Sequence, residues 1–350
     1  MINRLYIQNL KSISELEINC SNLNLFVGTN SSGKSTVLQS LLLLSQNINQ
    51  NSGLNGYLTS LGEFREAKNF NVDKKEITVS VEDKDDKLEI TFWEDKEGNL
   101  QSEINCNNEE LKKIMSFDNN HIHYLSCHRI GALDIYNKNL SGYDEFGING
   151  EYTMYYLMKH GSDPLEKELI KSMDSYVLLN QVNYWLKYIV NSTVKTENIL
   201  GTDVLKAKYS MIDERELRPK NVGSGISYLV SLIIMCLASK KNDILIIENP
   251  EIHLHPKSQA RVCEFLYFIA QSGRQLFVET HSDHLFNGLR AGIATNSMDK
   301  EQMEINFLNI NNENCTENTK IQIGKRGKIL NQVNDLFDQF DADLNKMLGL

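Results

Sequence analysis

The sequence predicts an α/β fold built on a parallel sheet that helices cover on both faces. From about residue 220, short apolar strands alternate with helical segments: residues 226–238 and 260–269 are apolar at helical spacing, and 244–247 and 276–278 are uninterrupted apolar runs. Strands that lack a polar face are typical of parallel sheets buried between helices. A third apolar strand, residues 23–27, precedes a Gly/Ser-rich loop and another helical run.

That loop, residues 28–36, predicts a phosphate-binding P-loop, because it has glycines at both ends and a Lys-Ser pair opening the helix. Unpaired backbone N–H groups at a helix N-terminus cradle phosphate in a positive local field. We expect Lys34 to reach the β- and γ-phosphates and the Ser35 hydroxyl to take one position on Mg²⁺. The expected nucleotide-binding residues are Gly28, Asn30, Ser31, Ser32, Gly33, Lys34, Ser35 and Thr36. A Gly/Ser-rich turn without a ligand is the alternative, which the flanking strand and helix disfavour.

Two further strands end in residues that carry chemistry. Residues 243–248 form a hydrophobic strand ending in Glu248, the usual form of a Walker B element, whose acid holds Mg²⁺ directly or through water. A core strand capped by a surface Glu is the alternative, but it does not require the Asn249-Pro250-Glu251 continuation. The strand at 276–278 leads to His281, which can contact a γ-phosphate or an attacking water.

A fourth element precedes these strands. Gly223, Ser224 and Gly225 open the apolar helix at 226–238 and offer small residues and free N–H groups. This arrangement suits a second phosphate contact.

These four elements in this order resemble the ABC-type ATPases of the SMC, RecF and OLD group, as does the opening stretch of residues 5–13. The resemblance covers about residues 1–65 and 205–295. It implies a P-loop NTPase of the ABC-ATPase head type, with a mixed sheet, an antiparallel β extension, a helical lobe, and ATP and Mg²⁺ as cofactors. It also implies that residues 223–227 are a signature motif acting in trans on the nucleotide of a second subunit, and that Thr280 and His281 form the His switch.

One position departs from that family. ABC-type enzymes usually carry a Glu directly after the Walker B acid as the general base, whereas this chain has Asn249. A neutral amide orients a water but cannot take its proton. Either Glu251 supplies the base, or hydrolysis is slow and the protein is an ATP-gated switch; we favour slow hydrolysis. The expected catalytic residues are Glu251, Asn249 and His281, and the expected metal ligands are Ser35 and Glu248.

The segments between the motifs suggest five parts. They are an ATPase lobe (1–70), an antiparallel β-rich extension (71–148), a helical insert (149–205), a second ATPase lobe (206–295) and a small C-terminal region (296–350). Alternating apolar residues at 75–105 predict hairpins, and helical spacing recurs over 150–190. There is no sustained heptad pattern, which argues against a long coiled-coil arm.

The C-terminal region resembles the short domain of unknown function that often follows such ATPases in bacteria. Its acids lie at helical spacing with apolar residues, which favours an amphipathic helix over the Toprim nuclease domain of OLD proteins. The segment after residue 290 is also too short for that domain. The acids are Asp335, Asp338, Asp341 and Asp343.

Composition limits the partners. A net charge of −10 argues against non-specific coating of nucleic acid. Six cysteines without a C-x-x-C pair indicate reduced thiols in a cytoplasmic protein, and the absence of a long apolar segment argues against a membrane partner. Local basic groups at Lys325, Arg326 and Lys328, or Lys257 and Arg261, leave DNA contact as an open alternative, although a solvated surface is favoured.

Three weaker candidates remain. His253 and His255 lack a third metal ligand at suitable spacing. Arg129 contacts nucleotide, couples the lobes, or forms a structural salt bridge. Trp185 with its neighbouring tyrosines is interpreted as helix packing in preference to a base-stacking platform.

We therefore expect an ATP-hydrolysing head that forms a homodimer or higher homo-oligomer on ATP and transmits closure to a separate effector. Relatives are often ATPase components of bacterial anti-phage or toxin-like operons, paired with a nuclease or toxin. The alternatives are an OLD-like, nuclease-associated repair ATPase and a transporter subunit. The Glu-Asn-Pro-Glu element and the lack of a Leu-Ser-Gly-Gly-Gln sequence argue against the transporter.

Overall fold

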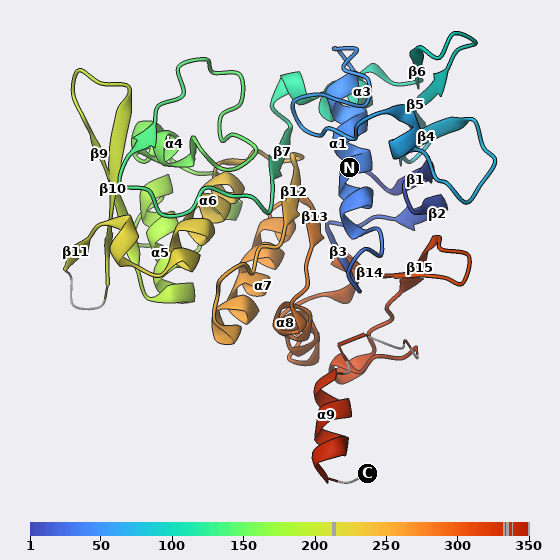
Figure 1. Ribbon diagram of the computed structural model, residues 1–350. Coiled ribbons are helices and arrows are strands. Elements are labelled where there is room, and N and C mark those ends of the chain that lie inside the picture. The colour runs from blue at the N-terminus through green and yellow to red at the C-terminus, as the bar shows by residue number, and fades with distance from the viewer. Residues whose placement is uncertain (212–214, 332, 334–335, 338, 349–350) are drawn as a thin grey trace.

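A six-stranded mixed sheet, in the order β15-β14-β3-β13-β12-β7, runs through the middle of the molecule (Figure 1). The computed structural model describes residues 1–211, 215–331, 333, 336–337 and 339–348. All strands of this sheet are parallel except β15, which is antiparallel to β14. The strands are β3 (Leu23–Gly28), β7 (Ile122–Leu125), β12 (Ile244–Glu248), β13 (Gln275–Glu279), β14 (Met303–Ile310) and β15 (Thr316–Lys320). The predicted mixed α/β fold is confirmed.

Both faces of this sheet are buried, as the uninterrupted apolar strands predicted. Leu25 and Val27 of β3 join one hydrophobic cluster with the helices of one face, while Phe26 joins a second cluster on the other face. Phe26 stacks there on Phe277 of β13, with ring centroids 6.5 Å apart. Side chains alternate across a strand, so the five parallel strands each contribute to both clusters, whereas the polar edge strand β15 contributes to neither.

A five-stranded antiparallel sheet, in the order β2-β1-β4-β5-β6, covers the second cluster. Helix α1 (Lys34–Asn47) lies between the two sheets and is buried along most of its length (Figure 1). The strands are β1 (Arg4–Leu10), β2 (Ile13–Asn19), β4 (Glu76–Asp83), β5 (Asp86–Glu94) and β6 (Leu100–Cys106). The hairpins predicted at 75–105 are confirmed as β4–β6.

Helices and a small four-stranded sheet cover the first cluster. The helices are α4 (Thr153–His160), α5 (Leu178–Val190), α6 (Ser224–Ala238), α7 (Pro256–Gln271) and α8 (Asp283–Ala294); the strands are β8 (Tyr136–Asn137), β9 (Thr193–Asn198), β10 (Val204–Ser210) and β11 (Glu216–Leu217). Short helices α2 (Phe64–Ala67) and α3 (Glu109–Met115) lie elsewhere, and α9 (Gln339–Leu348) extends away from the sheets (Figure 1). No helix in the described part of the chain is long and apolar enough to cross a membrane.

The five predicted segments remain a prediction. Each sheet contains strands from more than one of these segments. Residues 71–148 contribute β4–β6 to the antiparallel sheet but β7 to the central sheet, and residues 296–350 contribute β14 and β15 to the central sheet. Asp335 and Asp338 of the predicted C-terminal helix lie outside the described residues.

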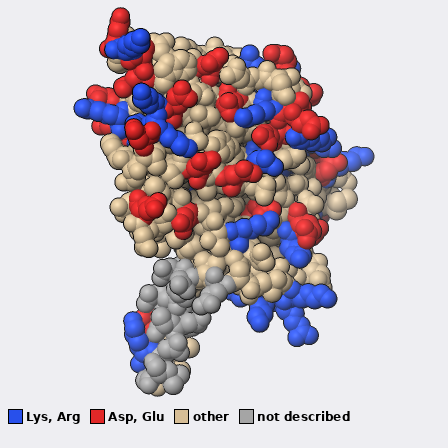
Figure 2. Space-filling view, turned by 90° about the vertical axis from the view of Figure 1, so that its right-hand side faces the viewer, with Lys and Arg blue, Asp and Glu red and all other residues tan. Residues whose placement is uncertain are grey.

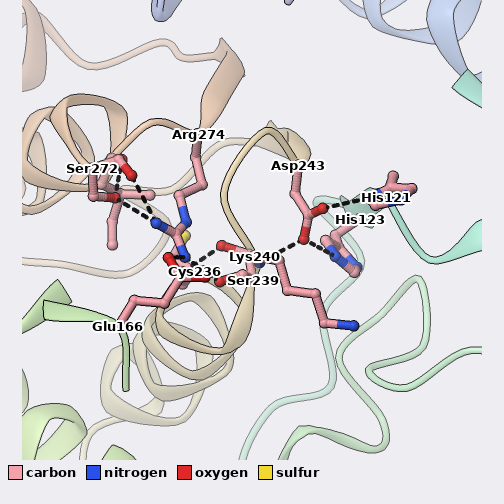
Figure 3. Close-up of polar contacts among 10 residues, drawn as sticks. His121, His123, Glu166, Cys236, Ser239, Lys240, Asp243, Ser272 and Arg274 are labelled. Carbon is pink, nitrogen blue, oxygen red and sulfur yellow. Dashed lines mark hydrogen bonds and ion pairs between the residues drawn. The ribbon is translucent and has the colours of Figure 1, made fainter. Parts of the chain in front are cut away.

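A buried arginine fixes the N-terminal end of β13. Arg274 is fully buried and donates hydrogen bonds to the carbonyl oxygens of Ser239 (2.6 Å) and Ser272 (2.7 Å). It also pairs with Glu166 at 2.8 Å (Figure 3). These contacts tie the strand to the end of α6, the end of α7 and the helical region.

A buried aspartate fixes the start of β12 in a similar way. The Asp243 carboxylate contacts Nδ1 of His121 at 2.9 Å and Nε2 of His123 at 3.1 Å, and accepts a hydrogen bond from the Lys240 amide at 2.6 Å (Figure 3). Burial raises the pKa of Asp243, but the contacts led by His123 outweigh burial and hold this pKa below its usual value. The N-terminal ends of both strands are thus anchored by polar contacts in the interior.

Replacing the buried arginine is therefore expected to destabilise the fold. Arg274→Met preserves much of the side-chain volume but leaves buried carbonyls without donors, so the free energy of unfolding falls by about 3 kcal/mol. The matched variant Glu166→Gln costs less than about 1 kcal/mol, because Glu166 is 43% exposed. Urea denaturation measures both; equal losses would contradict this account of Arg274.

Candidate nucleotide-binding site

The loop between β3 and α1 presses closely against β14 and β15. Gly28 has φ +142°, and a Cβ there would lie 2.0 Å from the Leu308 carbonyl oxygen. Gly33 has φ +98°, and a Cβ there would lie 2.5 Å from Oγ1 of Thr316. Both positions therefore require glycine, because a side chain would be strained and would displace a neighbouring strand.

Lys34 is held inside this loop. Its side chain is almost wholly buried, and its Nζ donates hydrogen bonds to the carbonyl oxygens of Gly28 (3.0 Å) and Thr29 (2.6 Å). Burial lowers the pKa of Lys34, and the nearby Glu279 carboxylate partly opposes that shift. Helix α1 has no side-chain cap at its N-terminus, so its first N–H groups are available to an anion.

A cleft of about 320 Å³ opens over the loop. The turn between β1 and β2 forms part of its wall, and His281 reaches it from the end of β13. The lining residues are Lys11, Ser12, Asn30, Ser31, Ser32, Gly33, Lys34, Ser35, Thr36, Glu279 and His281.

Two carboxylates stand side by side at the C-terminal edge of the sheet. The register of the parallel strands pairs Glu248 of β12 with Glu279 of β13. One Glu279 oxygen accepts a hydrogen bond from the Ser35 hydroxyl at 2.9 Å. The Glu248 carboxylate accepts hydrogen bonds from the Tyr124 hydroxyl (3.0 Å) and the Cys127 amide (2.9 Å).

The adjacent Glu248 and Glu279 carboxylates concentrate negative charge at this edge of the sheet. Burial, followed by the neighbouring Glu248 carboxylate, raises the pKa of Glu279 to about 7, against the opposing effects of Ser35 and Lys34. Two adjacent carboxylates, one of which has a raised pKa, form a natural environment for a divalent cation.

The turn after β12 brings the proposed catalytic residues to the same edge. The Asn249 amide donates to the Glu279 carbonyl at 2.8 Å, and one Glu251 oxygen accepts from the His281 amide at 2.8 Å. Burial raises the pKa of Glu251, and burial lowers that of His281 with a smaller contribution from Lys34. Glu251 is therefore kept in a poorly hydrated position beside His281.

Arg129 is hydrogen-bonded to the backbone of this turn. Its guanidinium is almost wholly buried and donates to the carbonyl oxygens of Glu248 and Asn249, the latter at 3.1 Å. Burial lowers the pKa of Arg129 to about 10, while Glu251 and Glu248 oppose the shift. Within the described residues Arg129 forms no ion pair at 4.0 Å or less, so the alternative of a structural salt bridge is wrong.

Several buried oxygen atoms at this edge lack a hydrogen-bond partner. A ligand that brings hydrogen-bond donors and a cation would satisfy such atoms. They are Ser32 Oγ, Asn249 Oδ1, Glu251 Oε2 and Glu279 Oε2. The described residues contain no ready-made cluster of three metal-ligating side chains, including around His253 and His255. Mg²⁺ usually takes one or two protein ligands together with phosphate oxygens and water, which fits Ser35 and Glu248.

The predicted signature residues lie elsewhere. Gly223 and Gly225, at the start of α6, line a second cleft of about 350 Å³ with His253, Lys257 and Arg261. Gly225 is tightly packed, since a Cβ there would lie 2.4 Å from the His253 carbonyl oxygen. One chain thus brings together the loop, Glu248, Glu251 and His281, and leaves the start of α6 in a separate cleft.

Sequence reasoning missed Glu279, Tyr124 and Cys127. Glu279 had a usable signal, because two adjacent parallel strands that both end in Glu place those acids together. Tyr124 and Cys127 gave no signal before the pairing of β7 with β12 was known. Trp185 is buried and its ring centroid lies 5.0 Å from that of Phe265, which confirms the helix-packing interpretation.

Comparison with known proteins gives a family and a fold. Residues 23–287 match the model of a family described as an AAA domain, putative AbiEii toxin, Type IV TA system. The comparison with curated proteins gives no match.

Two solved SMC heads share the fold. One is an SmcHead bound to the C-winged helix domain of ScpA, 15% identical, covering 92% of this chain and 97% of that chain with a TM-score of 0.56. The other is an Smc head domain with an extended coiled coil bound to the C-terminal domain of ScpA, from Pyrococcus furiosus. It is 12% identical, covers 99% of each chain and has a TM-score of 0.54.

The raised pKa of Glu279 predicts a pH-dependent effect on stability. The folded state keeps this group protonated to about pH 7, whereas the unfolded chain releases the proton near pH 4.5. The contribution of Glu279 to stability is therefore present at low pH and is lost as pH rises through 4.5 to 7. Glu279→Gln, which stays neutral, should raise the free energy of unfolding at about pH 8 by up to about 3 kcal/mol and change it little at about pH 5.

Urea denaturation without nucleotide or divalent metal at those two pH values measures this difference. Glu317→Gln, at an exposed position on β15, is the matched control. A Glu279→Gln effect of the same size at both pH values would contradict the assigned pKa shift.

Proposed function

The chain belongs to the AAA-domain family whose model matches residues 23–287, and from that premise we propose that it is an ATP-hydrolysing head that closes on a second copy of itself. The observation that carries this proposal is the edge where β3, β12 and β13 end together. The P-loop, the Ser35 hydroxyl and its partner Glu279 line one cleft there. Glu248 is paired with Glu279 in the strand register, and the buried Glu251 carboxylate accepts a hydrogen bond from the amide of His281, which also lines the cleft. That combination suits a nucleoside triphosphate with Mg²⁺.

Each group has a defined part in binding. The backbone N–H groups of the loop and Lys34 would hold the β- and γ-phosphates, and Ser35 and Glu248 would hold the metal. Mg²⁺, when bound, neutralises phosphate and carboxylate charge. Tyr124 and the Cys127 amide fix the Glu248 carboxylate by hydrogen bonds to both its oxygens.

We assign the general base to Glu251 and propose slow hydrolysis. Asn249 orients a water without taking its proton, whereas Glu251 is ionisable and has one buried oxygen without a partner. The Glu251 carboxylate is fixed by the His281 amide, so the proton acceptor and the His281 side chain are positioned together. Arg129 holds the carbonyl groups of the same turn and limits its movement.

Dimerisation is supported by the separation of the two clefts. Residues 223–225 lie at the uncapped N-terminus of a 15-residue helix and do not line the P-loop cleft. A helix N-terminus favours a phosphate group. A second copy of the chain can supply this helix end across the bound nucleotide, so that each complete site is built from two chains.

We further propose that closure gates a separate effector in a cytoplasmic bacterial toxin-like or anti-phage system. The family description names a putative toxin of a type IV TA system, and both similar SMC heads are described in complex with a partner domain. Acidic and basic side chains are interspersed over the face in Figure 2, which favours a protein partner over a continuous nucleic-acid surface. The exposed side chains of Lys325, Arg326 and Lys328 keep DNA contact as an outcome to test.

The dimer is tested by molar mass from light scattering, with and without ATP·Mg²⁺. We expect the mass to double with nucleotide. Ser224→Arg should prevent doubling because a bulky side chain fills the helix end, while ATP binding to the monomer persists. Ser162→Arg, at an exposed turn, is the control and should dimerise normally. A mass that does not change with nucleotide would refute the clamp.

The base is tested by the variant Glu251→Gln. Loss of general-base catalysis should lower the rate of phosphate release by about 100-fold and leave nucleotide affinity unchanged. Glu168→Gln, an exposed control, should hydrolyse ATP at the wild-type rate. Unchanged phosphate release by Glu251→Gln would assign the base to another group.

A further inference from the structure

The apolar side chain of Phe70 is exposed to solvent in the folded protein. Its exposed fraction is 81%, the highest of any aromatic side chain in the part of the chain that the structure describes. A single exposed apolar residue is common on protein surfaces, so its meaning depends on where it lies.

One side of the Phe70 segment is bonded to the turn that borders the P-loop cleft. The Lys11 amide donates to the Ala67 carbonyl at 2.7 Å, and the Asn69 amide donates to the Asn9 carbonyl at 3.2 Å. Lys11 and Ser12, in the same turn, line the cleft. Phe70 therefore follows directly on backbone that is fixed to the wall of the nucleotide site.

The other side is fixed to the chain leading into β15. Asn69 Nδ2 lies 4.0 Å from Cys315 Sγ, and Asn71 Nδ2 donates to the Asn314 carbonyl at 3.2 Å. The adjacent Thr316 contacts the Ser12 hydroxyl at 2.7 Å and abuts Gly33 of the loop. Asn69 and Asn71, the neighbours of Phe70, are thus bonded to β1 and to the chain leading into β15, which lie on either side of the P-loop.

The ring is also presented by an ordered turn. The Asn71 amide donates to Asn69 Oδ1 at 2.7 Å, an Asx turn around Phe70, and Asn69 is fully buried. Both amide side chains already make contacts within the protein, so they offer little for reading the edge of a base. An aromatic ring held in this way provides a stacking face with little base selectivity.

We propose that Phe70 stacks on the nucleobase of the nucleotide whose phosphates occupy the P-loop. This inference rests on the proposed function, because it requires phosphates at residues 28–36. A nucleotide held there by its phosphates extends its base out of the cleft, past the wall formed by Lys11 and Ser12. The exposed Phe70 ring, carried on backbone that is bonded to that wall, would cover apolar base surface that water would otherwise hydrate.

Calorimetric titration of ATP, GTP and inorganic tripolyphosphate, each with Mg²⁺, tests the proposal. Phe70→Ala should weaken ATP and GTP by about tenfold, because a base–aromatic stack is lost, and leave tripolyphosphate affinity unchanged. Phe70→Trp should restore both nucleotide affinities, and its fluorescence should change when ATP binds. Tyr176→Ala, at an exposed aromatic on the helical side, is the control and should bind all three ligands normally.

Wild-type ATP affinity in Phe70→Ala would overturn the stacking role alone. Equal weakening of all three ligands would also overturn it, because the change would then act on the loop. If the wild-type protein binds neither ATP nor tripolyphosphate, the proposed function itself fails.

Discussion

The arrangement of the site depends on the parallel register of β12 and β13, which sets Glu248 directly beside Glu279. Burial raises the pKa of Glu279, and the neighbouring Glu248 carboxylate adds to that shift. The Ser35 hydroxyl, donated by the first turn of α1, links this acid pair to the P-loop. A cation with phosphate ligands would offset the negative charge of this pair, and this is the physical basis of the Mg²⁺–nucleotide complex proposed above.

That register is maintained from both ends of the strands. At the N-terminal ends, Arg274 and Asp243 satisfy buried backbone and histidine groups that would otherwise leave the strands free to shift. At the C-terminal ends, Arg129 holds the carbonyls of the turn that carries Asn249 and Glu251. Helix α1 is enclosed by two sheets, so the P-loop has little room to move relative to the carboxylates.

The sequence was informative where chemistry is local. The P-loop lies in nine consecutive residues, and the strand ending in Glu248 is continuous with the turn that carries Asn249 and Glu251. Apolar runs without alternation correctly predicted the parallel strands. Contacts between distant segments were not predictable: β7 is only four residues long, and its partner β12 lies more than a hundred residues away. The roles of Tyr124 and Cys127 follow from that pairing, as the setting of Phe70 follows from β1 and β15.

The most direct test of the central claim is calorimetric titration of ATP into the wild-type protein at about pH 7, with and without Mg²⁺, in buffers of different ionisation enthalpy. The account predicts binding that depends strongly on Mg²⁺. It also predicts release of a fraction of a proton from Glu279, seen as a difference from Glu279→Gln. Binding that is equally tight without Mg²⁺, with the same proton release in both proteins, would contradict a site organised around the Glu248–Glu279 pair.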